Sequence, residues 1–224
     1  MNFSNIDWMY VAIAFVVVVI SVGLHEYGHA KFADLAGDLT PRMQGRVTLN
    51  PLAHLDPLGT VMFLVTIIAG VGIGWGKPVM VRPDKMKNPR WDHFISVLAG
   101  PMMNLLLACI FALAFRLLGA SKEDIAGMLG HSAGNVLLTF FALGVLINIG
   151  MMVFNLIPLG PLDGHWLVGA FLPENLRFRW YRFNRTYGSI ILLALILLPR
   201  QFDVISKLIA PVIIGLAKFF FGIK

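Results

Sequence analysis

An apolar run without a charged side chain occupies residues 8–24, and the polar run His25-Glu26-Tyr27-Gly28-His29 follows it directly. Its length suits a helix that crosses the hydrocarbon core of a bilayer, which takes about 20 residues. Within that core every backbone N–H and C=O must be paired inside the protein, and this restricts a chain to helices or a closed barrel. The run therefore predicts a retained transmembrane helix that continues to about residue 36 and carries the polar residues near its end.

Further apolar stretches extend this prediction to the whole chain, at about residues 58–71, 94–118, 136–157 and 187–221. Of the 224 residues, 58% are hydrophobic and only 13% are charged, whereas soluble domains carry about 25% charged residues. We expect an all-α polytopic membrane protein with about five to six membrane segments, in a single domain over residues 1–224. A short helix near residues 166–172 and a small β element near residues 70–81 complete this expectation.

The charges are distributed unevenly among the loops. Basic side chains predominate in residues 77–92 and 173–185, whereas the loop after residue 118 holds Lys122 against Glu123 and Asp124. The positive-inside rule places the first two loops in the cytoplasm and the third outside. The first helix then ends on the cytoplasmic side, so that stretch 58–71 cannot cross once and remain across. We expect a re-entrant or hairpin element there. Because the net charge of +6 belongs to such loops, it does not indicate a nucleic-acid partner.

The polar run has the spacing of a metal site. His25 and His29 are four residues apart, which places both imidazoles on one helix face. Glu26 is rotated by about 100° from His25 and can approach a metal-bound water without binding the ion. This is the HExxH arrangement of two zinc ligands and a general base. Short motifs also arise by chance, but these side chains are costly at the end of a membrane helix unless they have a function.

Asp163 is the strongest candidate for a third ligand. Catalytic zinc takes three protein ligands and keeps one position open. Asp163 follows the fourth apolar stretch, after prolines that end the helix. The predicted topology returns it to the same side of the membrane as His25 and His29, whereas a single crossing by stretch 58–71 would separate them. The alternative for Asp163 is an ordinary turn residue before Gly164.

Three further polar residues are weaker candidates. Asn104 lies at the start of the third apolar stretch, where its amide could donate to the oxyanion of a tetrahedral intermediate or form an interhelical hydrogen bond. His54 and Asn155 are possible secondary site residues, although a histidine in a loop more often has a structural role. The choice between these alternatives stays open at this point.

Taken together, these residues resemble the site-2 protease family of intramembrane zinc metalloproteases, and most closely its short bacterial branch. The shared motifs are His25-Glu26-Tyr27-Gly28-His29, Ala99-Gly100-Pro101-x-x-Asn104, Asn155-x-x-Pro158, Leu162-Asp163-Gly164, and the segments 45–60 and 74–79. One departure is Gly160, where short family members commonly have proline; we expect a looser turn before Asp163.

The resemblance implies one Zn²⁺ per chain, bound by His25, His29 and Asp163, with Glu26 as the base. It also implies a multi-pass protein of the plasma membrane whose active site faces the cytoplasm. The partners would be the lipid bilayer and the helix of a membrane-protein substrate, cut within or next to its transmembrane segment; the oligomeric state stays open. A metal transporter would need ligands in several spans, and an inactive relative would be expected to lack a ligand or the base.

Overall fold

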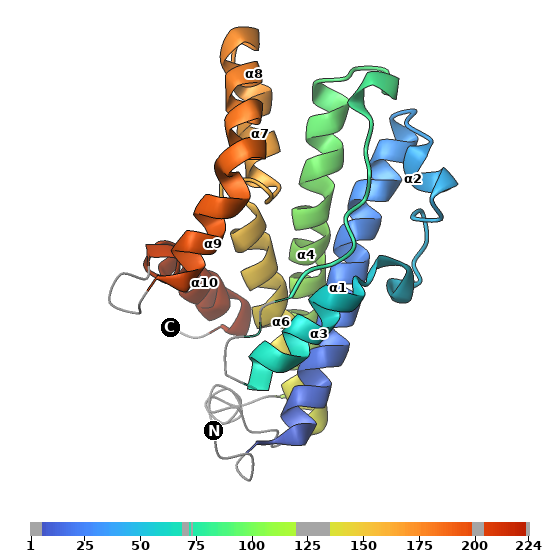
Figure 1. The fold of residues 1–224 in the computed structure, drawn as a ribbon. Helices are drawn as coiled ribbons and strands as arrows, with labels where there is room; N and C mark the ends of the chain where they lie inside the picture. Colours follow the sequence, from blue (N-terminus) through green and yellow to red (C-terminus); the bar gives the residue numbers. More distant parts are fainter. Residues whose placement is uncertain (1–5, 69–71, 73, 120–134, 199–203, 223–224) are drawn as a thin grey trace.

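The computed structural model describes residues 6–68, 72, 74–119, 135–198 and 204–222, and no strand occurs among them (Figure 1). The β element expected near residues 70–81 is reduced, in its described part, to one bridge between Leu55 and Gly76. Pro78 lacks the N–H that a continuing ladder would need. The loop with Lys122, Glu123 and Asp124 lies outside the described residues, as do residues 199–203.

Four helices in the described part of the chain are long and apolar enough to cross a membrane. They are α1 (Trp8–Leu35), α4 (Trp91–Leu117), α6 (Val136–Asn155) and α10 (Val204–Phe221). In Figure 1, α1 rises from the N-terminal end, α4 descends beside it, and α6 rises again. The prediction of an all-α multi-pass membrane protein is confirmed, while the count of five to six segments stays a prediction.

Small residues bring the central helices together. A Cβ added to Gly28 of α1 would lie 2.8 Å from the carbonyl oxygen of Ala99 on α4. Likewise, a Cβ on Gly144 of α6 would lie 2.4 Å from the ring of Phe111 on α4. Such close packing at small residues is the usual basis of helix association in membranes, where lipid is as apolar as the side chains. It fixes the relative positions of α1, α4 and α6, the three helices around the site.

The segment between α1 and α4 leaves the C-terminal end of α1 and returns to the same end. It passes through α2 (Thr40–Met43), η2 (Pro51–His54) and α3 (Pro57–Ile68), and it returns in an extended segment over residues 74–90 that includes η3 (Pro83–Lys85). The Lys77 N–H donates to the His54 carbonyl at 2.8 Å, and the Lys87 N–H to the Ala36 carbonyl at 3.1 Å. Residue 87 therefore lies beside the C-terminal end of α1. The chain between them leaves and returns to the same end, as the expected hairpin at residues 58–71 requires, while the position of this hairpin in a bilayer stays a prediction.

The C-terminal part contains more helix than expected. The predicted short helix is present as α7 (Gly164–Phe171). The prediction of a loop at residues 173–185 is wrong, because α8 (Glu174–Phe183) and a π-helical turn, η4 (Asn184–Gly188), run without a break into α9 (Ser189–Leu197). Arginine is a good helix former, and Glu174 in the first turn complements the helix dipole. Charge alone therefore did not distinguish this amphipathic helix from a loop.

Candidate metal centre

Three side chains from separate parts of the sequence converge at one point. His25 and His29 lie in the C-terminal half of α1, and Asp163 lies in the turn between α6 and α7. The two imidazole Nε2 atoms are 3.0 Å apart. Asp163 Oδ2 is 3.3 Å from Nε2 of His25, and its Oδ1 is 3.4 Å from Nε2 of His29. The structure thus brings together the three residues that were predicted as ligands.

Hydrogen bonds on the far side of each ring set the direction of the imidazoles. His29 Nδ1 lies 2.9 Å from the carbonyl oxygen of Ser96, and His25 Nδ1 lies 2.6 Å from Oδ1 of Asn104. Because a carbonyl oxygen only accepts, each Nδ1 carries a hydrogen and donates it. In a neutral imidazole Nε2 then holds a lone pair. Both lone pairs point toward the carboxylate of Asp163.

This arrangement fits a metal ion. Zn–N and Zn–O bonds of 2.0–2.2 Å in a tetrahedron imply ligand–ligand distances of about 3.3 Å, close to the 3.0, 3.3 and 3.4 Å found here. Oδ2 of Asp163 is buried without a hydrogen bond from the described residues. Burial by itself raises the pKa of Asp163, so a cation beside this carboxyl group is what favours its ionised form. Three converging electron-pair donors need a cation between them.

Gly100 of α4 leaves room for both imidazoles. A Cβ at this position would lie 2.3 Å from Nε2 of His29 and 2.9 Å from Cε1 of His25. The backbone of α4 therefore passes directly against the ring edges that face the proposed ion. Pro101, within the same helix, has no N–H to donate to the carbonyl of Val97, the residue after Ser96.

Glu26 lies beside the returning segment. Its Oε1 would be 3.4 Å from a Cβ placed on Gly76, and the His54 carbonyl oxygen would be 3.2 Å from the same Cβ. The same Cβ would lie 2.6 Å from Cγ1 of Val22 on α1, so a residue without a side chain lets the extended backbone pass this close to the helix that carries the motif. The excursion after α1 thus ends with its backbone next to the carboxylate that was predicted as the base.

The turn that carries Asp163 is held by hydrogen bonds and by close packing. The Gly160 N–H donates to Oδ1 of Asn184 in η4 at 2.7 Å, a bond that a proline at position 160 could not form. A Cβ on Gly164 would come within 2.3 Å of the Ile157 and Leu156 carbonyl oxygens. The N–H of Gly160 therefore links this turn to η4, and the expectation of a looser turn than proline would give stays a prediction.

The weaker candidates occupy other positions. His54 is fully buried, with Nε2 3.0 Å from the Thr48 carbonyl oxygen, and its own carbonyl accepts from Lys77. Asn155 donates to the Met151 carbonyl of its own helix at 3.0 Å. Both side chains thus bond to main-chain carbonyl oxygens, and a site role for either residue stays a prediction. The Asn104 amide nitrogen donates to Oδ1 of Asn148 and to the Ser21 carbonyl, which favours the interhelical interpretation over an oxyanion donor.

Sequence reasoning did not identify Ser96, Asn148 or Ser21 as members of the site. Ser96 acts through its backbone carbonyl, which no side-chain motif reveals. Asn148 and Ser21 do carry a signal in the sequence: each is a polar residue inside a long apolar helix, where such residues are costly without a partner.

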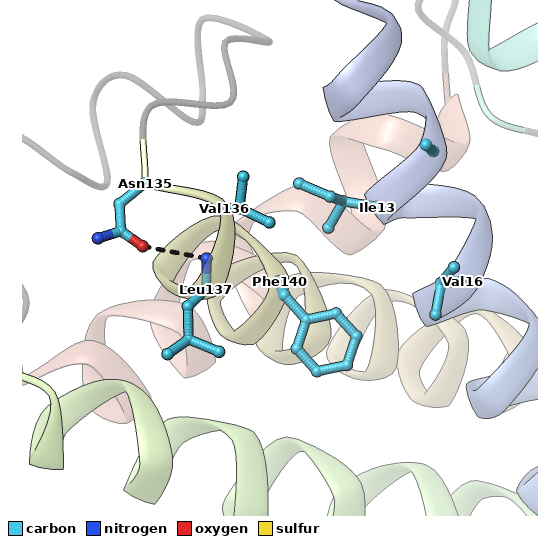
Figure 2. Close-up of a pocket in the computed structure, with 7 residues that line it drawn as sticks. Ile13, Val16, Asn135, Val136, Leu137 and Phe140 are labelled. Carbon is cyan, nitrogen blue, oxygen red and sulfur yellow. Dashed lines mark hydrogen bonds between the residues drawn. The ribbon is translucent and has the colours of Figure 1, made fainter.

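A separate apolar recess of about 510 Å³ lies between α1 and α6, lined by residues such as Ile13, Val16 and Phe140 (Figure 2). Along α1, Val16 is about 14 Å from His25 at 1.5 Å per residue. The residues that line the recess include no titratable side chain. The chemistry of this protein is therefore not located there.

Comparison with known proteins agrees with this centre. The family model for peptidase family M50 matches residues 13–199. YwhC of Bacillus subtilis (strain 168), named as a candidate zinc metalloprotease, is 35% identical over 184 residues, which cover 82% of this chain and 80% of YwhC. Rip2 of Mycobacterium tuberculosis (strain H37Rv), named in the same way, is 34% identical over 193 residues, or 83% of this chain and 68% of Rip2.

Rip2 of Mycolicibacterium smegmatis is 30% identical over 194 residues, or 85% of this chain and 70% of that protein. No solved structure matches the chain significantly. The family match covers the three convergent residues and the helices that carry them. This chain is a member of peptidase family M50, and it is a zinc metalloprotease of the membrane.

Proposed function

We propose that this protein cuts peptide bonds within or next to the transmembrane segments of membrane-protein substrates, as a step of regulated intramembrane proteolysis. His25, His29 and Asp163 would hold the zinc ion, and Glu26 would act as general base. The observation that carries this proposal is the convergence of two imidazoles and a carboxylate at the end of an apolar helix.

Zinc, when bound, lowers the pKa of its water ligand to about 7 and polarises the substrate carbonyl. Glu26, on the same helix as the two histidines, would accept a proton from the attacking water and pass it to the leaving amine. Ser96 and Asn104 hold the two imidazoles with their Nε2 lone pairs inward. Asp163 contributes an ionised carboxylate from a turn that Asn184 anchors.

The length of α1 supports a site near one membrane surface. Its 28 residues extend about 42 Å at 1.5 Å per residue, whereas the hydrocarbon core is about 30 Å thick. If Trp8 lies at the outer boundary, His25 and His29 lie about 26 and 32 Å further along. Both ligands would then sit close to the cytoplasmic boundary, where water and a partly unwound substrate helix can meet.

The function can be tested by mapping new protein N-termini in membranes of cells that express either wild-type protein or His29→Ala. We expect N-termini specific to the wild type, and we expect them within or beside segments of about 20 apolar residues. The His29→Ala cells are the matched control, because the proposed metal ligand is absent there. New N-termini that lie only in soluble segments would contradict an intramembrane substrate.

The proposed topology gives a second prediction. In a Cys109→Ala background, Asp84→Cys should be labelled by a membrane-impermeant maleimide only after the cells are opened, because residues 77–92 are expected in the cytoplasm. Asp84 suits this purpose since its side chain is 64% exposed. Ser121→Cys, in the loop predicted outside, is the matched control and should react in intact cells. Labelling of Asp84→Cys in intact cells would place residues 77–92 outside and contradict the proposed orientation in the membrane.

A further inference from the structure

Three fully buried polar side chains form a continuous chain behind the metal centre. Ser21 of α1, Asn104 of α4 and Asn148 of α6 each have a relative exposure of 0%. They come from three different helices of an apolar bundle, where an unpaired polar group is costly. The end of the chain at Asn104 touches Nδ1 of His25 at 2.6 Å. The network therefore reaches a proposed ligand without touching the proposed ion.

The direction of every hydrogen bond in this network of Ser21, Asn104 and Asn148 can be assigned, because main-chain carbonyl oxygens at its ends can only accept. The hydroxyl of Ser21 donates to the Val17 carbonyl at 2.7 Å, which leaves its oxygen free to accept. Nδ2 of Asn148 lies 2.9 Å from that oxygen and 2.8 Å from the Gly144 carbonyl. A carbonyl cannot donate, so the NH₂ group of Asn148 must face Gly144 and Ser21.

The remaining atoms follow from this assignment. Oδ1 of Asn148 points toward Asn104 at 2.8 Å and accepts from its Nδ2. A second N–H of Asn104 points toward the Ser21 carbonyl at 3.4 Å. With its NH₂ group used in this way, Asn104 can present only Oδ1 to His25. That oxygen requires an N–H at Nδ1 of His25, and the Nε2 lone pair is then directed into the site.

We infer that Asn148 is a positioning residue for metal binding: it fixes the amide orientation of Asn104, which in turn fixes the tautomer of His25. This inference rests on the proposed function, because it takes His25 to be a zinc ligand. Partners that orient a metal-bound histidine change metal affinity by about 10- to 100-fold when they are removed. Without Asn148 the Asn104 amide is free to turn its NH₂ group toward His25 and oppose the tautomer that binds metal.

A purely structural role for Asn148 makes different predictions. If Asn148 only joined helices, leucine would be tolerated better than aspartate, because a buried acid is costlier than an apolar side chain of similar size. If Asn148 positions Asn104, aspartate should preserve zinc affinity better, because it keeps an acceptor oxygen facing the Asn104 amide. The two roles therefore predict opposite orders for Asn148→Leu and Asn148→Asp.

The experiment measures the zinc dissociation constant of purified full-length variants by competition with a chelator. Asn148→Leu is expected to bind zinc about 10- to 100-fold more weakly than wild type, and Asn148→Asp is expected to lie between them. Thr139→Val, another buried polar position of α6, is the matched control and should bind as wild type does. Asn148→Ala replaces Asn148→Leu in the comparison if the leucine variant does not fold.

A double-mutant cycle tests whether Asn148 acts through Asn104. In an Asn104→Leu background, Asn148→Leu and Asn148→Asp should bind zinc equally and little worse than Asn104→Leu alone. If Asn148→Asp and Asn148→Leu still differed in zinc affinity in that background, the charge of aspartate would be acting through space, and the inference would be overturned. Wild-type zinc affinity of the single variant Asn148→Leu would overturn it as well. His25→Ala distinguishes failure of this inference from failure of the proposed function: if this variant retains zinc at wild-type affinity, the proposed ligand set itself is wrong.

Discussion

Glu26→Gln is expected to slow peptide-bond cleavage by about 10²- to 10⁴-fold, the contribution that a positioned general base makes, while zinc content stays near one per chain. Glutamine has nearly the shape of glutamate but cannot accept the proton of a water at neutral pH. The distances among His25, His29 and Asp163 involve no atom of Glu26. Substitution of a general base abolishes cleavage but leaves the metal bound, whereas substitution of a ligand removes both.

The measurement combines metal analysis of the purified protein with the cleavage rate of a substrate found by N-terminal mapping. His25→Ala is the matched comparison, because it should lose both zinc and cleavage. Two results would contradict the assignment of Glu26. A cleavage rate near that of the wild type would require another base, and loss of zinc from Glu26→Gln would indicate a ligand.

Much of the fold could be predicted because a bilayer restricts the possible structures. Apolar runs identified α1, α4 and α6 to within a few residues, since a spanning segment must be both long and helical. The same reasoning missed α8 because arginine and aromatic residues alternate there over a short length, and high charge resembles that of a loop. It also predicted a β element over residues 70–81, whose described part forms one bridge with Leu55 and one hydrogen bond to the His54 carbonyl.

The candidate site could be predicted in part for a different reason. The spacing of His25 and His29 on one helix is local, so the sequence shows it directly, whereas Asp163 required an argument about which side of the membrane each segment reaches. The groups that orient the imidazoles were not predictable in this way. Ser96 contributes a backbone carbonyl, and Asn148 meets Asn104 only because α4 and α6 pack at one particular register.

Gly100→Ala is the second substitution with a large expected effect. Its added Cβ would lie 2.3 Å from Nε2 of His29, whereas ordinary van der Waals contact begins at 3.4 Å. The ring must therefore move by about 1 Å, and a displacement of this size in an active site costs about 10²-fold in rate. We expect weaker zinc binding together with a loss of cleavage of about that size, in contrast to Glu26→Gln.

Gly150→Ala provides the matched control, because Gly150 also lies in a membrane helix and an added Cβ there meets nothing within 4 Å. Alanine is favoured over glycine in a helix interior by about 1 kcal/mol, so neither variant should unfold for reasons of helix propensity. Thermal unfolding of both variants without zinc separates a local steric effect from a general loss of stability. If Gly100→Ala kept wild-type zinc affinity and cleavage, the imidazoles would not be held against α4, and the tautomers assigned through Ser96 and Asn104 would lose their basis.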